Sequence, residues 1–201
     1  MNIVSVYNTR GAGRGHFPYT PDHIESLKNQ LGRLGHELAV IGHDLTLFHV
    51  ENFSGWWSKA VIFAPEYKNL RPMLALDLDT IVVRSLDPIL ELDPSRLWLI
   101  RQFLSKTHLA EMGLCTVPDS EVSDRIWQAC VRADKSRQPG EIVRRFPHDF
   151  IPDVVDGIYS YKKHCTVDSY PEDARVICYH GKPKPPDVEG WALEWWQDSL
   201  N

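Results

Sequence analysis

Two aspartates separated by a single leucine give this sequence its clearest chemical signal. Asp77 and Asp79 follow Met73-Leu74-Ala75-Leu76, an apolar run typical of a buried strand. Strand ends are where α/β sheets bind ligands, and alternation along an extended backbone would put both carboxylates on one side. The two charges repel unless a cation lies between them, and hard oxygen ligands suit Mn²⁺ or Mg²⁺. Because D-x-D also arises by chance, two solvated aspartates at a strand end are the alternative.

A second polar group follows another predicted strand near the end of the chain. His180-Gly181-Lys182-Pro183-Lys184 comes directly after the apolar stretch 175–179. The histidine offers a nitrogen ligand, the glycine permits close backbone approach, and the lysines are point charges suited to phosphate. If His180 binds a metal, its ring must be neutral, so we expect nucleotide binding to weaken between about pH 7 and 5.5. The alternative is a basic surface loop.

A glycine-rich stretch near the amino terminus, Gly11-Ala12-Gly13-Arg14-Gly15, matches neither the dinucleotide fingerprint nor the P-loop. We interpret it as a loop in which Arg10 and Arg14 are available for phosphate.

The composition is that of an ordinary globular protein. Of 201 residues, 43% are hydrophobic and 24% are charged, and the net charge of −5 builds in no general attraction to nucleic acid or anionic lipid. Four scattered cysteines predict neither a disulfide framework nor a zinc cage. Neither a signal peptide nor an apolar run of about 18 residues is found. We therefore expect a cytoplasmic protein without a transmembrane segment.

Strand and helix patterns alternate along the chain. Strands are predicted at 3–7, 38–41, 45–50, 73–76 with a continuation at 81–83, 97–100 and 175–179. Helices are predicted at 21–34, 56–63, 120–132 and from about 188, whereas 134–147 is mostly polar and predicted to be a loop. This order predicts an α/β fold with a mainly parallel central sheet flanked by helices, in one compact domain over residues 1–201.

The aspartate motif in its context resembles a known enzyme family. The stretch 71–80, followed by Leu86-Asp87-Pro88, is similar to the strand, D-x-D motif and turn of nucleotide-sugar glycosyltransferases with the GT-A fold. The greatest similarity is to the family 8 type, which includes glycogenin and the bacterial lipopolysaccharide galactosyltransferases. Residues 180–185 look like a shortened form of that family's H-x-x-G-x-x-K-P-W segment.

Three further segments carry the same resemblance. Residues 56–63 are similar to the helix that bears a basic donor-contacting residue, and 160–165 and 191–196 look like a bacterial and phage subgroup. The resemblance covers residues 1–100 and 158–198, and it implies a GT-A-like fold.

The resemblance also implies an activity and a site. It implies a metal-dependent glycosyltransferase that moves a sugar from a UDP-sugar to an acceptor, with Mn²⁺ (or Mg²⁺) held by Asp77, Asp79 and His180. Asp149 is the only carboxylate near the position where the family binds the transferred sugar, and it is the predicted catalytic residue. The residues implied to contact the donor are Tyr7, Asn8, Thr9, Lys59, Arg71, Leu78, Gly181, Lys182 and Lys184.

The sequence departs from the family at its sugar-binding segments. In place of N-S-G and G-D-Q it has Glu111-Met112-Gly113-Leu114 and Pro147-His148-Asp149-Phe150. This keeps open a nucleotide-sugar-binding protein that has lost transfer activity. A phosphohydrolase would need further clustered carboxylates, which the sequence does not offer. For the acceptor, a saccharide is favoured over a protein or a modified DNA base, and the net negative charge weighs against DNA.

Overall fold

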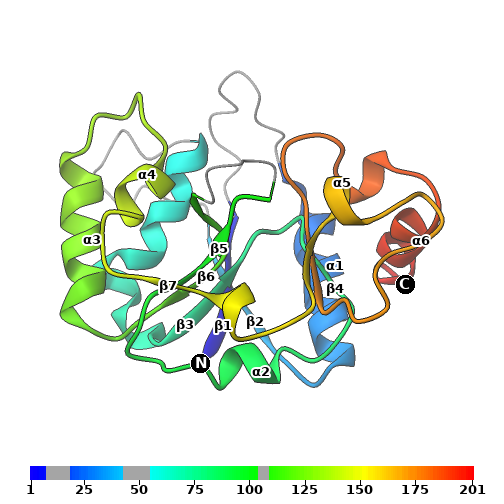
Figure 1. Ribbon diagram of the computed structural model, residues 1–201, viewed down its shortest axis with the longest axis horizontal. Coiled ribbons are helices and arrows are strands. Elements are labelled where there is room, and N and C mark those ends of the chain that lie inside the picture. Colours follow the sequence, from blue (N-terminus) through cyan, green and yellow to red (C-terminus); the bar gives the residue numbers. More distant parts are fainter. Residues whose placement is uncertain (8–18, 43–54, 104–108) are drawn as a thin grey trace.

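A six-stranded sheet forms the centre of the protein, as the computed structural model shows for residues 1–7, 19–42, 55–103 and 109–201 (Figure 1). Its strands lie in the order β2-β1-β3-β6-β5-β7. Every strand except β6 runs in the same direction, because β6 is antiparallel to both β3 and β5. The bounds are β1 (Asn2–Val6), β2 (Leu38–Ile41), β3 (Met73–Leu76), β5 (Trp98–Arg101), β6 (Ala110–Val117) and β7 (Asp149–Phe150).

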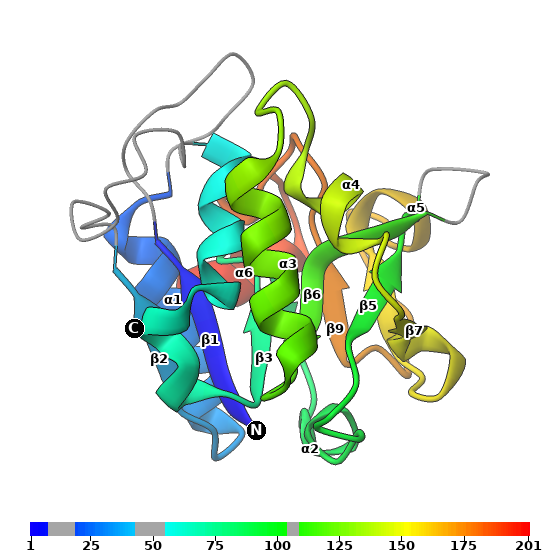
Figure 2. The same cartoon turned by 90° about the vertical axis from the view of Figure 1, so that its left-hand side faces the viewer.

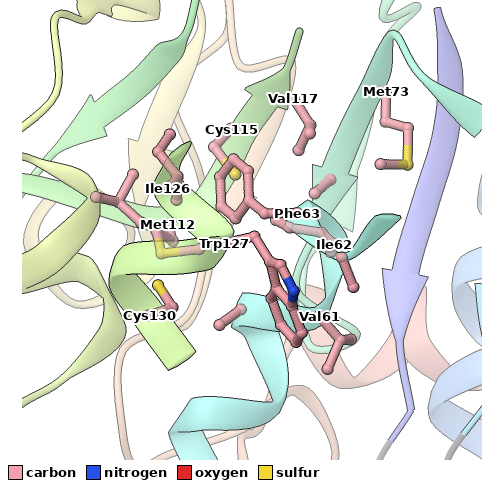
Figure 3. Close-up of a cluster of buried hydrophobic side chains, with 14 of the residues drawn as sticks. Val61, Ile62, Phe63, Met73, Met112, Cys115, Val117, Ile126, Trp127 and Cys130 are labelled. Carbon is pink, nitrogen blue, oxygen red and sulfur yellow. The ribbon is translucent and has the colours of Figure 1, made fainter. Parts of the chain in front are cut away.

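Helical segments cover one face of this sheet and bury a hydrophobic core (Figures 2 and 3). They are η2 (Gly55–Phe63), α3 (Glu121–Arg132) and α4 (Pro139–Val143). Phe63 of η2 and Ile126, Trp127 and Cys130 of α3 pack onto side chains of β3 and β6, such as Cys115. The apolar residues of α3 recur at spacings of 1, 3 and 4, so one stripe of the helix faces the sheet.

The opposite face is covered by α1 (Pro21–Arg33) and a small second sheet (Figure 1). In α1, Leu27 and Leu31 are fully buried, while Thr20 precedes the helix as its N-cap. The second sheet has the order β4-β9-β8, with bounds β4 (Ile81–Val82), β8 (Ile158–Ser160) and β9 (Val176–Cys178). Because both faces of the main sheet are covered, a strand such as β3 is apolar at every position.

The carboxy-terminal helix α6 (Trp191–Asp198) packs beside α1 at the edge of this layer (Figure 1). Asn29 donates a hydrogen bond to the carbonyl oxygen of Ser199 at 2.8 Å, and the Ser26 and Ser199 hydroxyls bond to each other. The remaining short helices are α2 (Asp87–Leu90), α5 (Tyr161–His164), η3 (Pro65–Leu70), η4 (Ile151–Asp153) and η5 (Pro185–Asp187). Among the described residues, no helix is both long and apolar enough to cross a bilayer.

The predicted α/β class and mainly parallel sheet are confirmed, with three local corrections. The eight-residue strand β6 was not predicted, and residues 81–83 do not extend β3 but contribute β4 to the second sheet. The polar stretch 134–147 is not all loop, since it contains α4, which begins at Pro139. The predicted strand at 45–50 lies outside the described residues.

Candidate active site

The register of the sheet brings several predicted site residues to one edge, the one formed by the carboxyl ends of its parallel strands. Val4 of β1 lies opposite Ala75 of β3, so Tyr7 and Leu78, each three residues further on, follow the same ends of these parallel strands. The antiparallel strand β6 reaches this edge with its first half. There the backbone N–H of Asp77 donates to the carbonyl of Gly113 at 3.0 Å.

The two aspartates of the motif lie at the end of β3 but not on a continued strand. The Thr80 N–H donates to the Asp77 carbonyl at 3.1 Å, so the chain turns directly after Leu76. The alternation that would put both carboxylates on one side therefore stops at Asp77. As a result, different parts of the protein surround the two carboxylates.

Each aspartate is paired with a lysine from another segment. Lys59 of η2 places its Nζ 2.5 Å from Oδ2 of Asp77, whose side chain is 18% exposed. Lys184, from the loop after β9, bonds to Oδ2 of Asp79, which is only 1% exposed. The Tyr19 hydroxyl donates to Oδ1 of Asp79 at 3.2 Å. Both oxygens of the buried Asp79 carboxylate thus have a donor.

The electrostatics of Asp77 and Lys59 reflect their burial and their mutual contact. Burial raises the pKa of Asp77; Lys59 counteracts this effect and Asp79 adds to it. For Lys59, burial acts to lower the pKa, but the charge and hydrogen bond of Asp77, with help from Asp79 and Glu111, raise it overall. The lysine is therefore held as a cation, and the surroundings of Asp77 favour a positive partner.

His180 lies across the same edge with one ring nitrogen that has no partner. Its Nδ1 is 3.5 Å from Oε2 of Glu111, on β6, whereas Nε2 is buried and finds no hydrogen-bond partner among the described residues. Burial lowers the pKa of His180 to about 4, Asp79 opposes this shift, and the nearby lysines add to it. The ring is therefore neutral near pH 7. The expected weakening of nucleotide binding between pH 7 and 5.5 stays a prediction, and this lowered pKa does not favour it.

These donors fit a divalent cation by their chemistry. Two carboxylates and a neutral imidazole nitrogen are ligands for Mn²⁺ or Mg²⁺, and metal-binding histidines commonly donate their other N–H to a carboxylate, the place that Glu111 takes here. Within the described part of the chain, however, no three His, Cys, Asp or Glu side chains converge closely enough to hold a metal as they stand. The lysines on Asp77 and Asp79 occupy oxygens that a metal would need.

The loop after His180 gathers positive charge at the same edge. Gly181 has a φ of +65°, a conformation that favours glycine, and a Cβ placed there would lie 3.8 Å from Nζ of Lys162. Lys182 is exposed, whereas the Lys184 side chain is 13% exposed because it reaches inward to Asp79. An anionic ligand at this edge would therefore meet lysines from two segments.

Arg71 does not belong to this group. Its side chain has no exposed surface, and its guanidinium donates to the carbonyls of Phe63 and Ala64 and to Oδ1 of Asp124 at 2.8 Å. It ties η2 to α3 inside the protein, so the structure does not support the predicted donor contact.

Asp149 is separated from the aspartate motif as well. It begins β7, the outermost strand on one side of the sheet, and Oδ2 of its carboxylate is 2.5 Å from Arg96. Three strand spacings, about 14 Å, lie between β7 and β3. Asp149 also lies opposite Trp98 at the start of β5, while Asp77 follows the end of β3. The structure therefore does not place the predicted catalytic carboxylate with Asp77.

The remaining predicted donor contacts divide into two groups. Leu78 is 1% exposed and belongs to the core, so its side chain has no surface for a donor contact, and Tyr7 lies partly buried at the end of β1. Asn8 and Thr9 lie outside the described residues, as do Arg10 and Arg14.

Three residues at this edge were missed by the sequence analysis. Tyr19 precedes α1 and bonds to Asp79, Glu111 faces His180, and Lys162 lies beside Gly181. Glu111 carried a signal, since it stands in the segment that departs from the family pattern. Lys162 stands in the segment 160–165, whose resemblance assigned it no role, and Tyr19 carried no local motif. Their positions at the site depend on how α5 and α1 pack.

Comparison with known proteins gives matches only among solved structures. No protein-family model matches the sequence, and no curated protein does. The chain aligns over its full length with 49% of the WbbM bifunctional glycosyltransferase, at 12% identity and a TM-score of 0.67. It also aligns over its full length with 95% of the galactosyltransferase LgtC in complex with donor and acceptor sugar analogs (13%, TM-score 0.63). GlyE of Streptococcus pneumoniae TIGR4 is similar over 60% of its chain (13%, TM-score 0.64).

The chain has a glycosyltransferase fold. This confirms the GT-A-like architecture expected from the sequence, while the family 8 subgroup and a bacterial or phage origin stay predictions. The chain spans about half the length of WbbM, so the activity of that whole protein does not transfer to it.

Proposed function

We propose that this protein is a metal-dependent glycosyltransferase that moves a sugar from a UDP-sugar to an acceptor hydroxyl. The observation that carries the proposal is the group at the end of β3: the Asp77 and Asp79 carboxylates and the buried, unpartnered Nε2 of a neutral His180. The glycosyltransferase fold supports it.

Each residue of the group has a distinct task in this proposal. Asp77, Asp79 and Nε2 of His180 would hold Mn²⁺ or Mg²⁺, which when bound supplies positive charge to the diphosphate leaving group. The Nδ1–H of His180 would donate a hydrogen bond to the Glu111 carboxylate, which leaves the lone pair on Nε2 free for the metal. Lys162, beside Gly181, and Lys182 would add positive charge where the diphosphate carries its negative charge.

A saccharide is the acceptor that we favour. The LgtC structure similar to this chain holds donor and acceptor sugar analogs, which supports a sugar hydroxyl as the attacking group. The net charge of −5 does not favour a duplex nucleic acid acceptor.

Calorimetric titration with UDP tests the donor site. UDP should bind at least tenfold more weakly in EDTA than in Mn²⁺. Asp77→Asn or Asp79→Asn should remove most of this difference in affinity, because each replaces a charged metal ligand by a neutral amide of the same shape. Asp119→Asn, at an exposed position, is the matched control and should bind like the parent. Equal affinity in Mn²⁺ and EDTA would overturn the metal-dependent donor site.

Release of UDP from UDP-sugars tests the chemistry. Slow Mn²⁺-dependent hydrolysis of one UDP-sugar, lost in Asp79→Asn, is the expected result for a transferase supplied with water as acceptor. Tight metal-dependent binding without hydrolysis, and without transfer to a panel of saccharides, would instead identify a nucleotide-sugar-binding protein that has lost transfer.

A further inference from the structure

The D-x-D motif already has its positive charge, supplied by the chain itself. Lys59 pairs with Oδ2 of Asp77 at 2.5 Å, and Lys184 pairs with Oδ2 of Asp79. Two ammonium groups therefore neutralise the two carboxylates that the proposed function assigns to a metal. A divalent cation that binds Asp77 and Asp79 must compete with both lysines.

Asp79 is the position where this competition is strongest. The carboxylate is 1% exposed, and its second oxygen already accepts from the Tyr19 hydroxyl at 3.2 Å. A carboxylate so deeply buried is costly to leave without a cation, because water cannot solvate it. Lys184 therefore stays on Asp79 until another positive charge replaces it.

The two lysines differ in how freely they can leave. Lys59 projects from η2, whose neighbouring residues Ala60 and Val61 are fully buried, so its backbone is fixed against the sheet. Lys184 belongs to the loop between β9 and η5, and its backbone N–H is held by Asp187 at 3.1 Å. Its side chain can therefore turn away from Asp79 without disturbing the fold of the loop.

The same loop lies where the diphosphate of the donor is proposed to bind. Gly181 is next to His180, and Lys162 approaches it from α5. In the nucleotide-free protein, a lysine that left Asp79 could turn to carboxylates such as the exposed Asp187, whose Oδ2 already accepts from the Lys184 backbone N–H. A diphosphate at this edge would offer it a partner with more negative charge.

We propose that Lys184 is an exchangeable counter-ion of Asp79, which neutralises the carboxylate in the metal-free protein and passes to the diphosphate when metal and nucleotide bind together. This inference rests on the proposed function. It assigns Lys184 to the coupling of the two ligands in addition to phosphate binding.

The exchange has a thermodynamic signature. Mn²⁺ alone must displace Lys184 from the buried Asp79 into exposed surroundings, where an ion pair contributes little, so it binds weakly. With UDP present the displaced ammonium gains the diphosphate as a strongly charged partner, so each ligand strengthens the other by the same factor. We expect UDP to raise the affinity for Mn²⁺ by at least thirtyfold in the parent protein.

Lys184→Met removes the ammonium and keeps an apolar stem of similar length. MnCl₂ alone, followed by the loss of the free Mn²⁺ signal in electron paramagnetic resonance, should bind at least tenfold more tightly to this variant. The factor by which UDP strengthens Mn²⁺ binding should fall at least fivefold, and the thermal midpoint in EDTA should fall because Asp79 has lost its cation. Lys28→Met, at an exposed position of α1 outside the site, is the control and should keep the parent's affinity for Mn²⁺ alone.

Lys184→Arg keeps the test decisive if the methionine variant folds poorly. Arginine retains the charge and can hold Asp79 through two hydrogen bonds, so Mn²⁺ alone should bind no more tightly than to the parent. Tight Mn²⁺–UDP binding together with an unchanged affinity for Mn²⁺ alone in Lys184→Met would overturn the exchange but leave the proposed function standing. Failure of Mn²⁺ to bind any of the proteins, with or without UDP, would overturn both.

Discussion

Arg71 gives the clearest test of how the buried charges of this protein are used. The sequence resemblance assigns it to the donor, whereas in the structure its guanidinium is enclosed and binds Asp124 and the carbonyls of Phe63 and Ala64. Arg71→Met removes the charge and the hydrogen bonds while keeping a long side chain in the same space. If the role is structural, this change lowers stability and leaves UDP binding intact.

The expected magnitude follows from what each partner loses. The Ala64 carbonyl still accepts from the Tyr67 N–H at 3.1 Å, and Asp124 is 46% exposed, so water can solvate its carboxylate. The Phe63 carbonyl is left as a buried acceptor without its donor, which costs about 1–3 kcal/mol. Loss of the charge-assisted bond to Asp124 adds about 1 kcal/mol. We therefore expect the free energy of unfolding to fall by about 2–4 kcal/mol, the combined size of these losses.

Urea unfolding followed by tryptophan fluorescence measures this change, with Arg132→Met, at an exposed position of α3, as the matched control. Titration of the folded variant with UDP in Mn²⁺ tests whether Arg71 contributes to donor binding. A free energy of unfolding within about 0.5 kcal/mol of the parent would refute the structural role, since surface changes have effects of that size. A tenfold loss of UDP affinity in the fully folded variant would restore Arg71 to the donor site.

Three further outcomes are expected. Burial lowers the pKa of His180 to about 4, so as the pH falls the unfolded chain takes up a proton before the folded protein does. The free energy of unfolding should therefore fall by up to about 3 kcal/mol between about pH 6.5 and pH 4, and by less in His180→Gln. Urea unfolding without metal at a series of pH values measures this change. Glu111→Gln should weaken Mn²⁺-dependent UDP binding at least tenfold in calorimetry, because Nδ1 loses its charged acceptor, and unchanged affinity would exclude this role. Gly190→Ala should lower the thermal midpoint strongly, because at φ +69° its Cβ would lie 2.0 Å from the Val167 carbonyl oxygen. Gly32→Ala is the control: nothing lies within 4 Å of its Cβ, so it should be neutral or stabilising. A similar shift of the thermal midpoint in both variants would contradict the argument.

Local patterns predicted most of the elements that surround the site. Apolar runs gave β1, β3 and β5, and the spacing of leucines and the Thr20-Pro21 start gave α1. These signals are local, since a continuous apolar run or a 3.6-residue period reports burial whatever the partner is. The strand β6 had no such signal, because Glu111 and Gly113 interrupt its apolar run and only its pairing with β3 and β5 makes it a strand.

The sequence by itself determined that Asp77 and Asp79 follow a buried strand and that a histidine and two lysines follow another, because adjacent residues stay adjacent in any fold. Only the tertiary structure decided which charges meet. It pairs Lys59 with Asp77 and Lys184 with Asp79, turns Arg71 into the interior, and moves Asp149 to the far edge of the sheet. Such contacts join residues up to 105 positions apart, and they depend on strand order and register, which no local spacing encodes.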